Sequence, residues 1–416
     1  MKNKNLKRVF TTLLVLVLTA GVYFLGFFSY RWTRSSVVKD VLKILEIYEK
    51  HYYFKSDEVV DEIADAIFDD YSTYYTAPEY AQITSKNNGK NFGVGLSFYT
   101  GTLDIYNVDV NSPCYKAGVK AGGTLVSATK GGVLTNGFEA KETLENLSEG
   151  EEVSIGIDYG GNVETYNVLK SRYGLSYVTY MNSIGAYVFH EKDNSMQFEK
   201  NSNAVISGEG VGYIKLNSFS GKADNSYGVV YQMKTALEKF KQDGNKKLIL
   251  DLRNNGGGDM EVVSSVSSML IKKRQSKQCF AISEDRDGNK KYYYLNGNIS
   301  DDYGIEKIII LANINTASAS EMLIGAMLDY DDNNAVQVII DGYNRNGETV
   351  YKTYGKGILQ TTYKYPDGSA VKVTTAKVFW PKSNVSIHGV GVTEATSNKV
   401  VKAVDKTAYS LALEII

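Results

Sequence analysis

Short apolar runs alternate with helix-like segments from Val211 onward, and this alternation limits the fold more than any other feature of the sequence. Parallel strands need long crossover connections, which are usually helices. The pattern therefore predicts an α/β core with an at least partly parallel sheet in residues 173–416. The expected strands are residues 211–216, 247–252, 307–312 and 336–340, and the expected helices are residues 229–240, 260–271 and about 320–328.

Three regions with different patterns precede these strands. Residues 35–87 have apolar side chains at helical spacing, which predicts a small helical module. Residues 88–172 contain short alternating runs and are expected to form a compact, strand-rich domain with one short helix at 141–147. Gly160 and Gly161 separate two of these runs, a strong hairpin signal. The polar residues 175–210 are expected to form loops or an extra hairpin.

The N-terminal residues 1–34 have the pattern of a membrane segment. An uncharged, apolar run extends from Val9 to Tyr30, about the length that a helix needs to cross a bilayer. Basic residues before this run favour an N-terminus inside the cell, with the rest of the chain extracytoplasmic. We therefore expect a single-pass anchor in the cell membrane. A cleaved signal peptide, with secretion of the remainder, is the alternative, because Thr19-Ala20-Gly21 offers small residues within the run.

Charge and composition argue against several kinds of partner. The formal net charge of −1 gives no broad attraction to nucleic acid. The two cysteines, Cys114 and Cys279, and the three histidines have no metal-ligand spacing. We therefore expect neither a metal site nor a nucleic-acid partner.

Ser318 is a candidate nucleophile. It lies between an expected buried strand and an apolar helix, where backbone N–H groups and the helix dipole favour negative charge. A purely structural role as a helix cap is also possible, because Ser318 and Glu321 have the spacing of a capping box. Helix capping and catalysis are compatible at one serine.

A nucleophilic serine needs a base, and Lys356 is the candidate. Flanking glycines allow close approach of the backbone, and apolar neighbours could lower the pKa of the amine from its usual value of about 10.4. Gln360, four residues on, could orient the amine. An exposed lysine in a turn is the alternative. The histidines His51, His190 and His388 lack a triad motif and are more simply surface or structural residues.

Three successive glycines follow the expected strand at 247–252. Gly256, Gly257 and Gly258 could expose backbone donors that stabilise an oxyanion. A phosphate-binding loop is a competing interpretation, but the required Gly-Lys-Ser/Thr ending is absent. A plain turn remains open.

In this order, the motifs resemble those of the carboxyl-terminal processing peptidases. The blocks that carry the resemblance are Asp-Leu-Arg-Asn-Asn-Gly-Gly-Gly at 251–258, Thr-Ala-Ser-Ala-Ser-Glu at 316–321, Thr-Tyr-Gly-Lys-Gly-Ile-Leu-Gln at 353–360, Asp-Asp-Tyr-Ser-Thr-Tyr at 69–74 and Gly-Tyr-Ile-Lys-Leu at 212–216. Together they cover about residues 35–400.

The resemblance implies a serine peptidase with an α/β catalytic core of the ClpP/crotonase-like type. By position, Ser318 corresponds to the nucleophile, Lys356 to the base and Gln360 to the residue that orients it. The backbone of Gly257 and Ala319 corresponds to the oxyanion hole. No cofactor is implied. The expected reaction is hydrolysis of peptide bonds in extracytoplasmic proteins through an acyl-enzyme.

The resemblance also implies that residues 88–172 are a PDZ-like domain that recognises the C-termini of protein or peptide substrates. Its carboxylate-binding loop would consist of Phe92, Gly93, Val94 and Gly95. A homo-oligomer is compatible with this assignment. The rival hypothesis is a membrane-anchored PDZ receptor or scaffold without catalytic activity. The presence of both Ser318 and Lys356 favours the enzyme.

Overall fold

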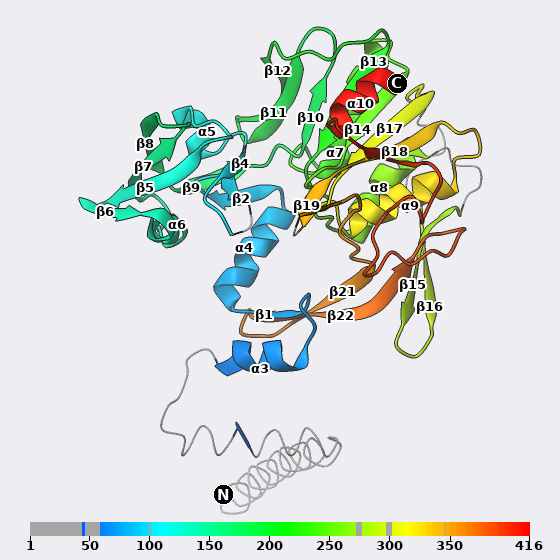
Figure 1. The fold of residues 1–416 in the computed structure, drawn as a ribbon. Helices are drawn as coiled ribbons and strands as arrows, with labels where there is room; N and C mark the ends of the chain where they lie inside the picture. Colours follow the sequence, from blue (N-terminus) through cyan, green and yellow to red (C-terminus); the bar gives the residue numbers. More distant parts are fainter. Residues whose placement is uncertain (1–43, 46–58, 100, 272–276, 297–301, 346) are drawn as a thin grey trace, which may run out of the picture. The chain divides into compact units, whose positions relative to one another are not determined.

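The computed structural model describes residues 44–45, 59–99, 101–271, 277–296, 302–345 and 347–416 (Figure 1). The chain divides into two compact units, residues 1–67 and 68–416. In the first unit, helix α3 (Val59–Ile67) lies within the predicted helical module. The predicted membrane segment at 1–34 lies outside the described residues. Within the described ranges, no helix has the length and apolar character needed to cross a membrane.

An eight-stranded sheet forms the centre of the second unit, in the order β12-β11-β10-β13-β14-β17-β18-β23. The five strands from β13 to β23 are parallel, and β10, β11 and β12 extend the sheet in antiparallel fashion. This confirms the mixed α/β core and its partly parallel sheet. Residues 175–210 contain β10 and the hairpin β11–β12, in agreement with the second of the two alternatives for this region. The strands are β10 (Val178–Met181), β11 (Ala186–Lys192), β12 (Ser195–Ser202), β13 (Val211–Leu216), β14 (Lys247–Asp251), β17 (Lys307–Ala312), β18 (Val336–Asp341) and β23 (Val400–Ala403).

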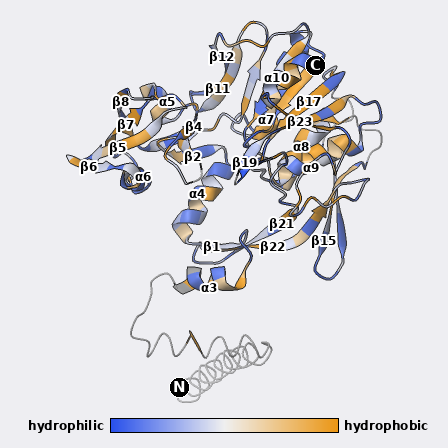
Figure 2. Ribbon diagram, in the orientation of Figure 1, coloured by the Kyte–Doolittle hydropathy of each residue, from blue (hydrophilic) through white to orange (hydrophobic). Residues whose placement is uncertain are grey.

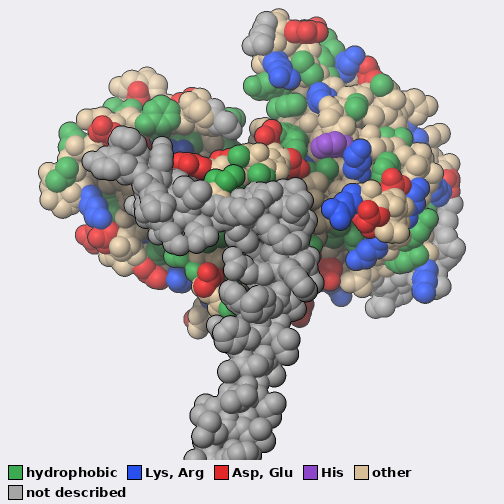
Figure 3. Space-filling model, turned by 90° about the horizontal axis from the view of Figure 1, so that it is seen from below, with side chains coloured by type: hydrophobic (Ala, Val, Ile, Leu, Met, Phe, Trp, Pro, Cys, Tyr) green, Lys and Arg blue, Asp and Glu red, His purple; other side chains and the backbone are tan. Residues whose placement is uncertain are grey.

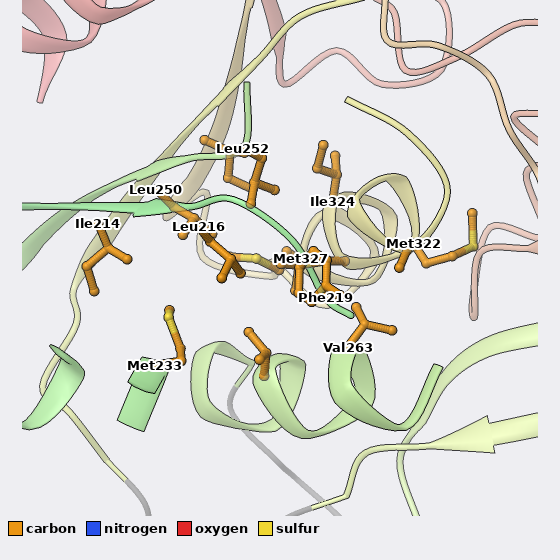
Figure 4. Close-up of a cluster of buried hydrophobic side chains, with 14 of the residues drawn as sticks. Ile214, Leu216, Phe219, Met233, Leu250, Leu252, Val263, Met322, Ile324 and Met327 are labelled. Carbon is orange, nitrogen blue, oxygen red and sulfur yellow. The ribbon is translucent and has the colours of Figure 1, made fainter. Parts of the chain in front are cut away.

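Helices cover both faces of this sheet because successive strand residues point to opposite sides. Ile308 and Ile310 of β17 join the core beneath α7 (Val229–Gln242), α8 (Met260–Leu270) and α9 (Ala319–Asp329). Ile309 and Leu311 face the other way, toward α10 (Ala408–Ile415). Figure 4 shows part of the first core, with Met327 of α9 close to Leu216 and Phe219. The central strand β17 is accordingly apolar over most of its length, in agreement with the colouring of Figure 2.

Residues 90–174 have an apolar core of their own, which includes Ile105, Leu125 and Ile155. Its main sheet has the order β6-β5-β7-β8, and β7 and β8 form the hairpin predicted at Gly160-Gly161. The helix predicted at 141–147 begins earlier, directly after Asn136, and ends at Glu145. The elements are β2 (Lys90–Gly93), β3 (Leu96–Phe98), β4 (Ile105–Val108), α5 (Pro113–Ala117), β5 (Thr124–Lys130), β6 (Val133–Asn136), α6 (Gly137–Glu145), β7 (Glu152–Asp158), β8 (Val163–Leu169) and β9 (Ser171–Gly174).

A second, five-stranded sheet was not predicted. Its order is β1-β22-β15-β16, with β21 also paired to β22. Its first strand, β1, follows the segment that begins at Asp69 and pairs with β22, the second strand after the predicted base. The strands are β1 (Thr73–Tyr75), β15 (Cys279–Asp285), β16 (Lys290–Tyr294), β21 (Ile358–Lys364) and β22 (Ala370–Phe379). Helix α4 (Ala77–Asn87) follows β1, and a short hairpin, β19 (Tyr343–Arg345) with β20 (Glu348–Val350), precedes the base.

Basic and acidic side chains are interspersed over the coloured part of the face seen in Figure 3. The view agrees with the near-neutral net charge of the whole sequence. It shows no broad field of one sign on this face.

Candidate active site

Ser318 lies at the turn between β17 and α9 in a backbone conformation that is rare for a residue with a side chain. Its φ is 57° and its ψ is −116°. Such strain persists only where the surroundings hold it, and it gathers at functional sites. A serine on a strained strand-to-helix turn presents its hydroxyl outward from the sheet edge, the arrangement seen in many serine hydrolases. The local geometry therefore suits a nucleophile.

The carboxylate of Glu321 holds this turn and the loop of the predicted base together. Glu321 is fully buried and accepts four hydrogen bonds. Two of its donors are the backbone N–H groups of Ser318, at 2.8 Å, and of Lys356, at 2.9 Å. The other two are the N–H of Gly355, at 2.8 Å, and Oγ1 of Thr353, at 2.5 Å. Burial raises the pKa of Glu321, and the four hydrogen bonds oppose that rise.

Lys356 is half-buried, and its amine has the partner that the sequence predicted. Nζ donates a hydrogen bond to Oε1 of Gln360 at 2.9 Å. It also lies over the ring of Tyr71, 4.9 Å from the centroid. Burial is the main cause that lowers the pKa of Lys356, the nearby charge of Lys372 lowers it further, and Asp69 opposes both. A lowered pKa is what a lysine needs in order to act as a base near neutral pH.

The glycine loop packs directly against the serine turn. A Cβ on Gly257 would lie 2.8 Å from N of Ala319 and 2.9 Å from Cβ of Ser318, so only glycine fits there. Asn255 joins the two segments, because its carbonyl oxygen accepts the N–H of Ala317 at 3.0 Å and Oγ of Ser320 at 2.9 Å. The loop is therefore part of the site and not a remote turn.

The two predicted oxyanion donors are placed differently. Ala319 is the first residue of α9, and the first N–H groups of a helix have no acceptor within that helix. The N–H of Gly257, in contrast, donates to Oδ1 of Asn255 at 3.0 Å. It would have to exchange that acceptor for a substrate oxygen.

Ser318, Lys356 and Gln360 line one cavity of about 890 Å³, together with Ala319 and the three glycines. Within the described part of the chain, no hydrogen bond joins Oγ of Ser318 to Nζ of Lys356. His388, which is exposed, does not line this cavity. A serine hydroxyl and a lysine amine, the two groups that a serine nucleophile and its base require, therefore share one cavity.

The residues predicted to bind a substrate carboxylate lie elsewhere. Phe92, Val94 and Gly95 line a second cavity of about 480 Å³, and Gly93 ends β2 beside them. The cations of Lys170 and Arg172 lie over the Phe92 ring at 4.9 and 5.3 Å. The structure does not bring this loop to Ser318, but Ser218 and Ser220 line both cavities.

Two residues, Glu321 and Tyr71, make contacts in the site that the sequence did not predict. Glu321 was recognised only as a capping residue, and Tyr71 only as a member of the motif at 69–74. The acidic residue three positions after Ser318 was a signal for the first. No local pattern in the sequence links Tyr71 to Lys356. Among the described residues, no cluster of three or more side chains could hold a metal ion.

Comparison with known proteins identifies relatives that are described as serine proteases. Residues 210–396 match the profile of peptidase family S41. A probable CtpA-like serine protease of Staphylococcus saprophyticus is 26% identical over 86% of this chain, and one of Staphylococcus haemolyticus is 26% identical over 94%. The chain spans 64% of the length of the first relative and 72% of the second.

Two solved structures have a similar fold. The photosystem II D1 C-terminal processing protease matches with a TM-score of 0.50 and 22% identity, over 90% of each chain. A Bacteroides fragilis protein assigned to the S41 proteases matches with a TM-score of 0.53 and 17% identity, over 87% of this chain and 90% of its own. The profile match, the relatives and the shared fold agree with the motifs: this chain carries a peptidase family S41 domain over residues 210–396.

Proposed function

We propose that this protein is a serine endopeptidase that cleaves peptide bonds through an acyl-enzyme on Ser318, with Lys356 as the base. One observation carries the proposal. The buried carboxylate of Glu321 binds the backbone of both residues, and their side chains line the same cavity. A capping box with only a structural role would need the hydrogen bond from the Ser318 N–H but not the one from the Lys356 N–H.

The reaction follows from the groups in place. The neutral amine of Lys356 takes the proton of the Ser318 hydroxyl as the oxygen attacks the scissile carbonyl. The Ala319 N–H, at the start of α9, faces the developing oxyanion, and the glycine loop supplies a second donor. The lysine then returns the proton to the leaving amine, and water releases the acyl group in a second, similar step. Gln360 holds the amine between these transfers.

Substrate selection is the second part of the proposal. The cavity lined by Phe92, Val94 and Gly95 would bind a substrate C-terminus as a PDZ-like site, with backbone N–H groups holding the carboxylate. Ser218 and Ser220, which line both cavities, give a bound chain a continuous path toward Ser318. A membrane-anchored, extracytoplasmic location, predicted from residues 1–34, remains part of this proposal.

The test is a cleavage assay with the full chain in detergent and an unstructured protein substrate. The wild type is compared with Ser318→Ala and Lys356→Ala, and the exposed residues Ser207 and Lys234 provide matched control variants, Ser207→Ala and Lys234→Ala. We expect cleavage by the wild type and both controls, and its loss in the two site variants. Cleavage that survives Ser318→Ala would contradict the proposal. Absence of wild-type cleavage with intact binding of C-terminal peptides would favour a receptor.

A further inference from the structure

The aromatic ring of Tyr71 covers the amine of Lys356, and the proposed reaction does not by itself require this ring. Nζ of Lys356 lies 4.9 Å from its centroid. The ring in turn meets Tyr354 and His388 edge-on, with centroid distances of 6.3 and 6.5 Å. Tyr71 is therefore held over the lysine by packing from two other loops.

The backbone of Tyr71 fixes the other partner of the lysine. Nε2 of Gln360 donates to the carbonyl oxygen of Tyr71, and Oε1 of Gln360 accepts from Lys356. A carbonyl oxygen can only accept a hydrogen bond. The contact thus decides which end of the Gln360 amide faces the amine.

The segment that carries Tyr71 is anchored to the sheet whose strand β21 begins two residues after Lys356. Thr73 of β1 lies opposite Lys372 of β22. Oγ of Ser72 accepts the N–H of Thr374 at 3.0 Å and donates to Asp69 at 2.6 Å. These contacts therefore fix residues 69–75 in place beside the site.

The ring also changes the electrostatic environment of the amine. An aromatic face attracts an ammonium group more than a neutral amine, so it favours the protonated form. Among the charged groups, Lys372 on β22 acts in the opposite direction, and Asp69 acts in the same direction as the ring. Glu321 on α9 binds the backbone N–H of Lys356.

We propose that Tyr71 is a positioning residue for the peptidase reaction. Its ring holds the Lys356 amine at the cavity shared with Ser318 and tunes its proton affinity, and its carbonyl orients Gln360. This inference rests on the proposed function. If Tyr71 has this role, residues 69–75, which precede the strand-rich region, contribute directly to the active site.

The test compares Tyr71→Phe, which keeps the ring, with Tyr71→Leu, which keeps an apolar cover without it. We expect Tyr71→Phe to cleave within about 3-fold of the wild type across the pH range. We expect Tyr71→Leu to lose about 10-fold in kcat with little change in KM, and its rising limb of activity to move about half a pH unit lower. A Tyr71→Leu variant with wild-type kcat and an unmoved limb would overturn the proposal, as would a Tyr71→Phe variant as defective as Tyr71→Leu.

A second readout needs no catalysis. Lysines react with acetic anhydride only as neutral amines, so peptide mass mapping across pH reports the pKa of Lys356, with Lys364 as an internal reference. In Tyr71→Leu we expect half-maximal labelling of Lys356 about half a pH unit lower, and unchanged labelling of Lys364. Equal labelling of Lys356 in both proteins would overturn the inference.

This labelling separates the two proposals. If the wild type cleaves no substrate, the peptidase proposal fails, while the labelling still decides whether the ring acts on Lys356. Thermal unfolding checks that each variant is folded. If Tyr71→Leu does not fold, Tyr71→Met fills similar space without a ring and carries the same expectations.

Discussion

Glu321 shows most clearly what a single residue does in this site. The sequence predicted its contact with the Ser318 N–H, because the spacing of a capping box is local. The bonds to Thr353, Gly355 and Lys356 come from a distant loop, and no local pattern could show that this loop folds onto α9. The same limit applies to Tyr71.

Replacing Glu321 with Gln tests the clamp. In the glutamine, one of the two carboxylate oxygens of Glu321 is replaced by an NH2 group. This group faces hydrogen-bond donors, so at least one buried backbone N–H loses its acceptor. We expect a loss of about 2–3 kcal/mol in the free energy of unfolding and at least about 100-fold in kcat/KM. Urea denaturation and the cleavage assay measure these effects, with Glu142→Gln on the exposed side of α6 as the control. Near-normal stability and activity would show that the clamp is dispensable.

Lys372→Gln tests the charge beside the base. Lys372 lowers the pKa of Lys356, so its removal should raise that pKa. In the proposed reaction Lys356 acts as the neutral amine, so activity rises with pH through its pKa, and the rising limb of kcat/KM should move to higher pH. Lys364→Gln, in the same sheet, is the control and should leave the limb in place. A limb that moves to lower pH in Lys372→Gln would contradict this assignment.

At the scale of elements, the strands and helices of the central sheet could be predicted well. Apolar runs such as Val211–Leu216 and Lys307–Ala312 are buried on both faces, so their pattern is strong. The second sheet was missed, although Asp287-Gly288 and Asp367-Gly368 both stand at its hairpin turns with positive φ at the glycines. Two of its strands, β16 and β22, are mostly partly or fully exposed and rich in Lys, Thr and Tyr, so they lack a strong apolar signal.

The glycine loop yields a prediction with an internal control. Gly257 has a φ of +98°, and an added Cβ would meet the serine turn, whereas a Cβ on Gly256 would meet nothing within 4 Å. We expect Gly257→Ala to lose at least about 100-fold in kcat and about 1–3 kcal/mol in the free energy of unfolding. Gly256→Ala should stay close to the wild type in both assays. Equal effects of the two changes would mean that close approach at Gly257 does not matter.

At the scale of the whole molecule, the sequence predicted which residues meet but not everything that surrounds them. Ser318, Gly257 and the pair Lys356 and Gln360 come from three separate segments of the chain, and they line one cavity. The family resemblance supplied this grouping, because each motif alone was also compatible with a purely structural role. The strand-rich region has its own core, separate from that of the α/β sheet. The membrane segment, the PDZ-like role and the ClpP/crotonase-like assignment of the core remain predictions.

Recognition of a free C-terminus is testable on the intact protein. Two forms of one peptide substrate, with a C-terminal carboxylate or a C-terminal amide, differ only in the group that the Phe92–Gly95 loop would bind. We expect the amide to raise KM by about 10-fold or more, because the backbone N–H groups lose a charged acceptor. Equal KM values would place substrate recognition outside this loop.

The central claim is that Ser318 is a nucleophile activated by Lys356. The most direct measurement is covalent labelling of the full chain with a serine-reactive fluorophosphonate, followed by peptide mapping. The account predicts one dominant adduct, on Ser318, whose rate of formation rises with pH and falls at least about 100-fold in Lys356→Ala. A dominant adduct on another residue, or a Ser318 adduct that forms equally fast without Lys356, would contradict it.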